Sequence, residues 1–176
     1  MDAMAFRRAL LGWYDRARRE LPWRGTRDPY RVWLSEIMLQ QTRAEAVAPR
    51  YEAFLSRFPT VEALAAADEE AVLKAWEGMG YYSRARNLRR AAMEVARRGG
   101  FPQSAKELKT LPGVGDYTAA AVASIAFDEA APALDGNQAR VLSRLLAFEE
   151  TVDTPQKLRA QAEALIDRER PGDYNQ

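Results

Sequence analysis

The sequence has no cysteine and no histidine among its 176 residues. Without cysteine the chain cannot form a disulfide, use a thiolate nucleophile or ligate an iron–sulfur cluster with its own side chains. Without histidine it lacks the commonest general base and metal ligand, and every Ser-His triad is excluded. Catalysis would therefore depend on carboxylates, lysine, tyrosine or backbone amides, while a structural or binding role needs none of these.

Long apolar runs are also absent. No stretch approaches about eighteen uninterrupted apolar residues, so the sequence predicts no transmembrane helix and no membrane partner. The amino-terminal segment carries acidic residues and too short an apolar run for a signal peptide, so we expect an intracellular protein.

The charge is nearly balanced, with 26 basic and 25 acidic side chains, but it is unevenly distributed. Residues 83–110 hold eight basic and two acidic side chains, whereas residues 128–170 hold six basic and nine acidic ones. A basic stretch beside an acidic one suits a polyanionic partner on one face. The same distribution of charge is equally expected if these arginines lie on solvent-exposed helix faces and bind no partner.

The fold class that the sequence predicts is all-α. No segment alternates apolar and polar residues for long enough to predict a strand, whereas apolar residues recur at helical spacing, as at Phe6, Leu10 and Trp13. The carboxy-terminal PGDYNQ segment is expected to carry no further helix. The predicted helices are 3–19, 29–42, 48–57, 61–66, 69–77, 83–98, 105–110, 116–127, 137–147 and 155–168.

Several predicted helices begin with a capping signal. Asp28-Pro29 and Thr154-Pro155 each place an N-cap residue before a proline at the first helical position. Ser104 with Glu107 forms a capping-box pattern. Asp68 and Asp116 are predicted to cap the helices that follow them.

The segment LPGVGDYT, residues 111–118, lies between two predicted helices. Two glycines in a short turn let the backbone approach a partner closely, and the amides near Gly113 and Gly115 would point outward at the start of a helix. Such a turn can bind a phosphate, helped by the helix dipole. The alternative is a tight helix–helix turn without a ligand.

Two carboxylates are candidates for acid–base work. Glu36 shares its helical surface with apolar residues, which favours the neutral, proton-donating form of its carboxyl group. The alternative is a glutamate at the polar edge of an amphipathic helix. Asp135 is predicted either to cap the helix that follows or to face a cleft as an ionised carboxylate. A neutral and a charged carboxyl together suit cleavage of a glycosidic bond.

The order of these segments resembles that of the helix-hairpin-helix DNA glycosylases, and among them the MutY-type adenine DNA glycosylases. The matching segments run over most of the chain: LPWR, PYRVWLSEIMLQQT, FPTVEALAAA, GMGYYSRARNL, LPGVGDYTA and LDGNQARVL. Endonuclease III-type relatives carry a catalytic lysine where this chain has Tyr117, and glutamine where it has Glu36. The resemblance therefore implies a monofunctional hydrolase without a Schiff-base amine.

The resemblance implies a role for each matching residue. The substrate would be duplex DNA with adenine mispaired with 8-oxoguanine or guanine, and the adenine would be flipped out. Glu36 would protonate adenine N7, Asp135 would stabilise the oxocarbenium ion, Asn137 would help position Asp135, and Tyr117 would pack against the sugar. The residues expected to contact DNA are Arg24, Gln40, Gln41, Tyr81, Arg84, Arg86, Leu111, Gly113, Val114 and Gly115, with Gln41 and Tyr81 as wedge residues.

The resemblance also implies what lies around the site. A monovalent cation, Na⁺ or K⁺, is expected at the hairpin carbonyls of Leu111 and Val114. Family members carry a four-cysteine iron–sulfur cluster and a Nudix-related domain past the DYNQ segment, so we interpret this chain as a fragment. We expect a six-helix domain at 20–128 and a second, incomplete lobe from 1–19 with 129–176. The protein would be a monomer, cytoplasmic and nucleoid-associated if prokaryotic.

Three other functions stay open at this point. An endonuclease III-like glycosylase/lyase is disfavoured by Glu36 and Tyr117. A catalytically silent DNA-binding fragment would bind duplex DNA without releasing a base. A helical protein–protein adaptor would show no salt-dependent binding to DNA.

Overall fold

The computed structural model describes residues 2–148 and 154–176, and these ranges contain helices and turns but no strand. The all-α prediction is confirmed for this part of the chain. None of the described helices is both long and apolar enough to cross a bilayer. In chain order the helices are α1 (Ala3–Ala17), α2 (Pro29–Leu39), α3 (Ala44–Arg57), α4 (Val61–Ala66), α5 (Glu69–Ala75), α6 (Tyr82–Arg98), α7 (Ala105–Leu108), α8 (Asp116–Phe127), α9 (Gly136–Leu145), α10 (Thr154–Leu165) and α11 (Pro171–Asn175).

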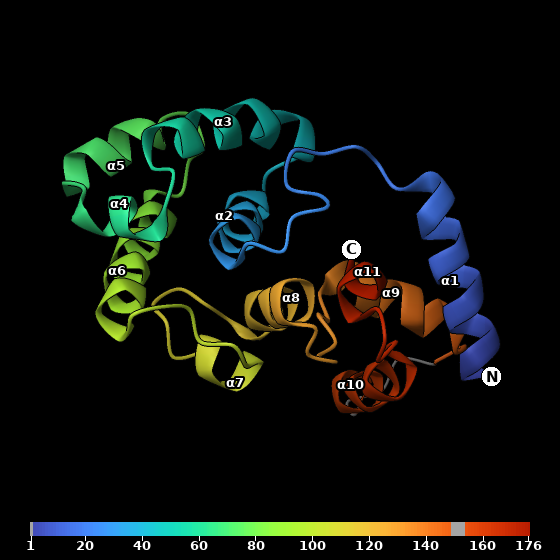
Figure 1. Ribbon diagram of the computed structural model, residues 1–176. Helices are drawn as coiled ribbons and strands as arrows, with labels where there is room; N and C mark the ends of the chain where they lie inside the picture. Colours follow the sequence, from blue (N-terminus) through green and yellow to red (C-terminus); the bar gives the residue numbers. More distant parts are fainter. Residues whose placement is uncertain (1, 149–153) are drawn as a thin grey trace.

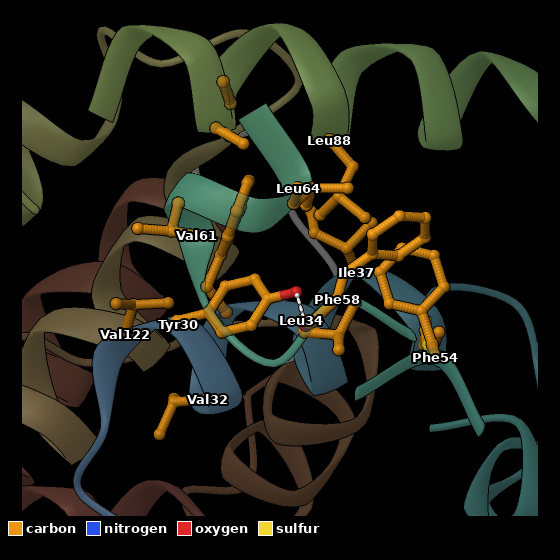
Figure 2. Packing of buried hydrophobic residues seen from close by; sticks show 14 of the residues in the cluster. Tyr30, Val32, Leu34, Ile37, Phe54, Phe58, Val61, Leu64, Leu88 and Val122 are labelled. Carbon is orange, nitrogen blue, oxygen red and sulfur yellow. Dashed lines mark hydrogen bonds between the residues drawn. The ribbon is translucent and has the colours of Figure 1, made fainter. Parts of the chain in front are cut away.

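The larger hydrophobic core surrounds α2, which packs against α3, α6 and α8 (Figure 1). Trp33, Leu34 and Met38 of α2 are fully buried. In Figure 2 the ring of Tyr30 lies among apolar side chains of the core such as Leu34 and Val61, and its hydroxyl donates a hydrogen bond to the Phe58 carbonyl at 2.7 Å. The core therefore fixes the helix that carries Glu36.

A second, smaller hydrophobic cluster joins α1, α9, α10 and α11. It contains Leu142, Leu158 and Leu165, with Phe6 and Tyr174 packed against them. The predicted division into residues 20–128 and residues 1–19 with 129–176 follows this distribution of clusters and stays a prediction.

The helix starts agree with the sequence where the capping signal is local. Asp28 accepts hydrogen bonds from the amides of Tyr30 and Arg31, as predicted. Ser104 accepts one from the Glu107 amide. The Thr154-Pro155 cap lies outside the described side chains.

One capping prediction is confirmed in position only, and another is wrong. Asp68 occupies the N-cap position of α5, but its side chain makes no capping hydrogen bond. Gly115, not Asp116, is the N-cap of α8. The Asp116 carboxylate instead forms ion pairs with Lys109 and, at 3.5 Å, with Arg159 of α10.

Helix boundaries differ from the prediction by three or four residues at three places, which are the end of α2 at Leu39, the start of α3 and the end of α10. α3 begins at Ala44, four residues earlier than predicted, with Pro49 inside it. The proline removes the amide that would bond the Glu45 carbonyl, but both residues are exposed, so water can take its place. α10 ends at Leu165, because the Asp167 carboxylate accepts from the amides of the residues that follow and forms a turn.

The segment expected to carry no helix forms α11, with Pro171 at its first position. This short helix docks on α8, where a Cβ at Gly172 would lie 2.9 Å from the Ile125 Cα. The Asn175 side-chain amide donates to the Ser124 hydroxyl at 2.8 Å and to the Ala131 carbonyl at 2.9 Å. Tertiary contacts of this kind leave no periodic signal in so short a segment.

Candidate active site

One cavity of about 860 Å³ lies between the two hydrophobic clusters. Its wall brings together Glu36 from α2, Tyr117 from α8, and Asp135 and Asn137 from the start of α9. These are the four predicted catalytic residues, which come from three helices that are distant in the sequence. The apolar part of the wall is formed by Phe6, Leu10, Leu39, Val141 and Leu142.

Glu36 is half-buried on α2, between the fully buried Trp33 and the largely buried Ile37. Its pKa is raised to about 7, chiefly by burial and to a smaller extent by the negative charge of Asp135. Hydrogen bonding with the Tyr117 hydroxyl and the positive charge of Arg24 act in the opposite direction. Near neutral pH this carboxyl group exists in both forms, as a general acid or base requires.

Tyr117 is the second residue of α8 and directly follows the hairpin. Burial and the charge of Glu36 raise the pKa of its phenol, so the hydroxyl stays protonated at neutral pH. It can donate a hydrogen bond but offers no amine. A Schiff base cannot form at this position.

Asp135 both caps α9 and lines the cavity, the two positions that the sequence left open. As the N-cap of α9 it accepts hydrogen bonds from the amides of Asn137 and Gln138, at 2.9 and 2.7 Å. Its second oxygen accepts from the Asn137 side chain at 3.0 Å. Capping thus fixes the carboxyl group on the cavity wall.

A smaller cavity of about 120 Å³ lies on another side of Glu36. Trp23, Arg24 and Ser35 line it together with Glu36 and Tyr117. Arg24, which the resemblance predicts to contact DNA, has its guanidinium 5.3 Å from the centre of the Tyr14 ring and donates to the Gln176 carbonyl at 2.9 Å. Arg24 therefore belongs to the surroundings of Glu36.

The predicted hairpin connects α7 to α8. Gly113 has a φ of +74°, and a Cβ there would lie 2.8 Å from the Asn87 Cβ, so only glycine fits without strain. Leu111 and Val114 point into the core and are buried, while the glycines are exposed. The Leu111 carbonyl accepts the Val114 amide at 3.2 Å. The cation at these carbonyls stays a prediction.

The two predicted wedge residues have the same unusual backbone conformation. Gln41, directly after the C-cap of α2, has a φ of +57°, and Tyr81, directly before α6, has a φ of +46°. Both side chains are exposed, Tyr81 to 63%. The Gln40 side chain turns inward instead and donates to the Thr118 hydroxyl at 3.3 Å. Strained, exposed residues of this kind are common at functional sites.

The arginines of α6 do not behave alike. Arg84 was expected to contact phosphate, but its guanidinium faces inward and donates to backbone carbonyls. Arg86 is exposed, and its Nε lies 3.1 Å from the Glu69 carboxylate. Of the two, only Arg86 is placed to reach a ligand outside the protein.

Trp23 and Ser35 line the smaller cavity, yet the sequence assigned a role to neither residue. Trp23 stands in the LPWR segment that supports the family resemblance, so a signal was present. Ser35 stands in the matching PYRVWLSEIMLQQT segment, so the same signal was present there, and its hydroxyl donates to the Val32 carbonyl within α2.

The chain has no cysteine, so its residues do not fit a cysteine-ligated iron–sulfur cluster. In the part of the chain that the structure describes, no group of three or more carboxylates could hold a metal ion.

The chain is similar in sequence to adenine DNA glycosylases. Adenine DNA glycosylase of Homo sapiens is 44% identical, over 99% of this chain and 35% of the human protein. That of Mycolicibacterium smegmatis is 42% identical, over 85% of this chain and 52% of its own length. The chain thus spans from about a third to a half of these relatives. The predicted resemblance to MutY-type enzymes is confirmed.

Solved structures share the fold. A thermostable thymine-DNA glycosylase superposes with a TM-score of 0.89 at 32% identity, over 98% of this chain and 82% of that chain. An endonuclease III trapped as a covalent intermediate with DNA superposes with a TM-score of 0.80, over 99% and 83%. At 23% identity the second likeness supports the fold alone.

A family model described as "HhH-GPD superfamily base excision DNA repair protein" matches residues 34–168, which include the hairpin, Glu36 and Asp135. With most of the chain inside that match, the protein belongs to the HhH-GPD superfamily of base excision DNA repair proteins.

Proposed function

We propose that this chain carries the catalytic machinery of an adenine DNA glycosylase, which hydrolyses the N-glycosidic bond of adenine mispaired with 8-oxoguanine or guanine. The observation that carries the proposal is the meeting of Glu36, whose pKa is raised to about 7, with Asp135 on one cavity wall. The 44% identity to human adenine DNA glycosylase favours adenine as the base.

Binding to DNA would begin at the hairpin. The exposed glycines 113 and 115 leave the backbone amides beside α8 accessible to a phosphate. Gln41 and Tyr81 would enter the duplex where the adenine leaves, since both side chains are exposed on turns held in a left-handed conformation. The extruded adenine would enter the cavity beside Glu36.

Protonation by Glu36 starts the reaction. Its carboxyl group gives a proton to adenine N7, and the C1′–N9 bond then breaks with its electron pair going to the adenine. The sugar is left as an oxocarbenium ion, which the Asp135 carboxylate stabilises. Asn137 holds that carboxylate through the 3.0 Å hydrogen bond from its side chain.

Water completes the hydrolysis. It adds to C1′, releases its proton to Asp135 or to solvent, and leaves an abasic site and free adenine. Because Tyr117 replaces the lysine of lyase relatives, the enzyme makes no Schiff base and does not break the strand itself.

The experiment uses a labelled duplex with adenine opposite 8-oxoguanine. We expect strand breaks only after hot alkali, no adduct on borohydride treatment, and no release by Glu36→Gln, which still binds the duplex. Glu52→Gln, an exposed glutamate on α3, is the matched control with full activity.

Other outcomes would overturn the proposal in distinct ways. Duplex binding without base release indicates a silent DNA-binding module, and no salt-dependent binding indicates an adaptor. A borohydride adduct indicates a lyase. Release of thymine from a G·T duplex but not of adenine would place the activity with the thymine-DNA glycosylase whose structure is similar.

A further inference from the structure

The carboxy-terminal end of α2 depends on a side chain from another helix. Carbonyls in the last turn of a helix lack intrahelical partners, and the last turn of α2 has no basic residue of its own. Arg84, on α6, supplies the donors: its Nη1 donates to the carbonyls of Ile37 and Met38 at 3.0 and 3.3 Å, and to that of Gln40.

The same guanidinium holds the turn before α6. Its Nη2 donates to the Met79 carbonyl at 3.1 Å. Its Cζ lies 5.3 Å from the centre of the Tyr81 ring and 5.6 Å from that of Trp76, as cation–π contacts require. The exposed Tyr81 ring thus contacts the Arg84 guanidinium, which is itself held by hydrogen bonds to backbone carbonyls.

Arg84 joins two turns that are far apart in the sequence. One leads into Gln41 and the other into Tyr81, and both of these residues have positive φ. Among the hydrogen bonds of the described residues, no other side chain reaches both turns. Arg84 therefore links the turn that leads into Gln41 to the turn that leads into Tyr81 by hydrogen bonds.

We propose that Arg84 is a positioning residue that holds Gln41 and Tyr81 at the spacing needed to enter a duplex together, a proposal that rests on the proposed function. It also fixes the end of α2, one turn after Glu36. It acts through these residues and does not itself touch DNA.

Lysine cannot replace arginine in this role. Its ammonium is a point charge with three donors, whereas the planar guanidinium reaches carbonyls on two turns and stacks on a ring at once. Arg84→Lys therefore keeps the charge and removes the bridge. A phosphate contact, in contrast, would survive this substitution in large part.

The first test needs no DNA. Hydrogen exchange is measured at the amides of Thr42 and Met79, which are hydrogen-bonded within the two turns. In Arg84→Lys we expect exchange there to be at least about tenfold faster, since several hydrogen bonds to the backbone are lost. The control, Arg97→Lys, alters an exposed arginine of the same helix and should change neither amide.

The second test measures recognition. Arg84→Lys should weaken binding to the A·8-oxoguanine duplex by about tenfold relative to a matched duplex, through loss of the wedge contacts. The pH midpoint of base release should not move, because Arg84 is absent from the groups that shift the pKa of Glu36. Unchanged exchange together with nearly unchanged binding in Arg84→Lys would overturn the proposal, because a phosphate contact largely survives this substitution.

The outcomes separate this proposal from the proposed function. Faster exchange in Arg84→Lys would support the proposal that Arg84 bridges the two turns. If the unsubstituted protein at the same time releases no adenine, only the proposed glycosylase function is rejected. If Arg84→Lys does not fold, nitrogen-15 NMR of the unsubstituted protein decides: slow guanidinium rotation is expected, and a freely rotating Arg84 would overturn the bridge.

Discussion

The carboxyl groups of Glu36 and Asp135 line one cavity, and the charge of Asp135 contributes to the raised pKa of Glu36. Asp135 is fixed there by capping α9, and Glu36 by the core around α2. One carboxyl is thereby biased toward its protonated form while the other faces it from a separate helix. The predictions that follow start from this relationship.

The rate of adenine release should depend on the protonated form of Glu36. With a pKa of about 7, single-turnover release is expected to be constant at lower pH and to fall by about tenfold per pH unit above it. Rapid-quench assays from pH 5 to 9 measure how the single-turnover rate falls with pH. A flat profile across that range would separate Glu36 from the chemistry.

Two groups near Glu36 should shift the midpoint of the pH profile of adenine release in opposite directions. Arg24 lowers the pKa of Glu36, so Arg24→Met should shift the midpoint to higher pH. Asp135 raises it, so Asp135→Asn should shift the midpoint to lower pH. Carbon-13 NMR of the Glu36 carboxyl follows both titrations even where activity is lost. Shifts of the same sign in both variants would contradict the arrangement.

The ionised carboxyl group of Glu36 should lower the free energy of unfolding of the protein near and above neutral pH. Its pKa rises from 4.5 to about 7 on folding, which means that the folded state favours the protonated carboxyl group. The contribution of Glu36 to the free energy of unfolding is therefore most favourable below pH 4.5 and is lost as pH rises to about 7. At pH 8, Glu36→Gln should therefore be more stable than the unsubstituted protein by roughly 2 to 4 kcal/mol. Urea unfolding at pH 4.5 and 8 measures the difference, which should nearly vanish at the lower pH.

Two substitutions separate the roles of Asp135. Asparagine is a good N-cap, so Asp135→Asn should fold with normal stability and yet release adenine at least about a hundredfold more slowly. Asp135→Ala should lose the cap as well, at about 1 kcal/mol. Thermal unfolding and single-turnover rates are compared side by side. A normal rate in Asp135→Asn would leave the residue as a helix cap only.

Gly113 should tolerate no side chain. Gly113→Ala has to strain a φ of +74° and displace Asn87, so the Tm should fall by several degrees, reflecting about 1 to 3 kcal/mol. Gly115→Ala meets nothing within 4 Å and has an ordinary φ of −90°, so its Tm should stay close to normal. Equal losses in both variants would contradict the tight packing of the hairpin.

Much of this protein could be predicted from the sequence because the signals are local. The cap at Asp28 and the turn at Gly113 each depend on residues within a few positions of one another, so the order of residues is enough. The four catalytic candidates were also identified from the sequence, through short segments whose order matches a family.

Only the tertiary structure decided how distant residues act on each other. Arg84 and Arg86 are two positions apart on one basic helix, yet one faces inward to backbone carbonyls and the other lies at the surface. Likewise, Gly172 and Asn175 of α11 fit against α8, a pair of contacts that the spacing of residues in this short segment does not predict. Such outcomes depend on which groups lie nearby after folding, and sequence spacing does not contain that information.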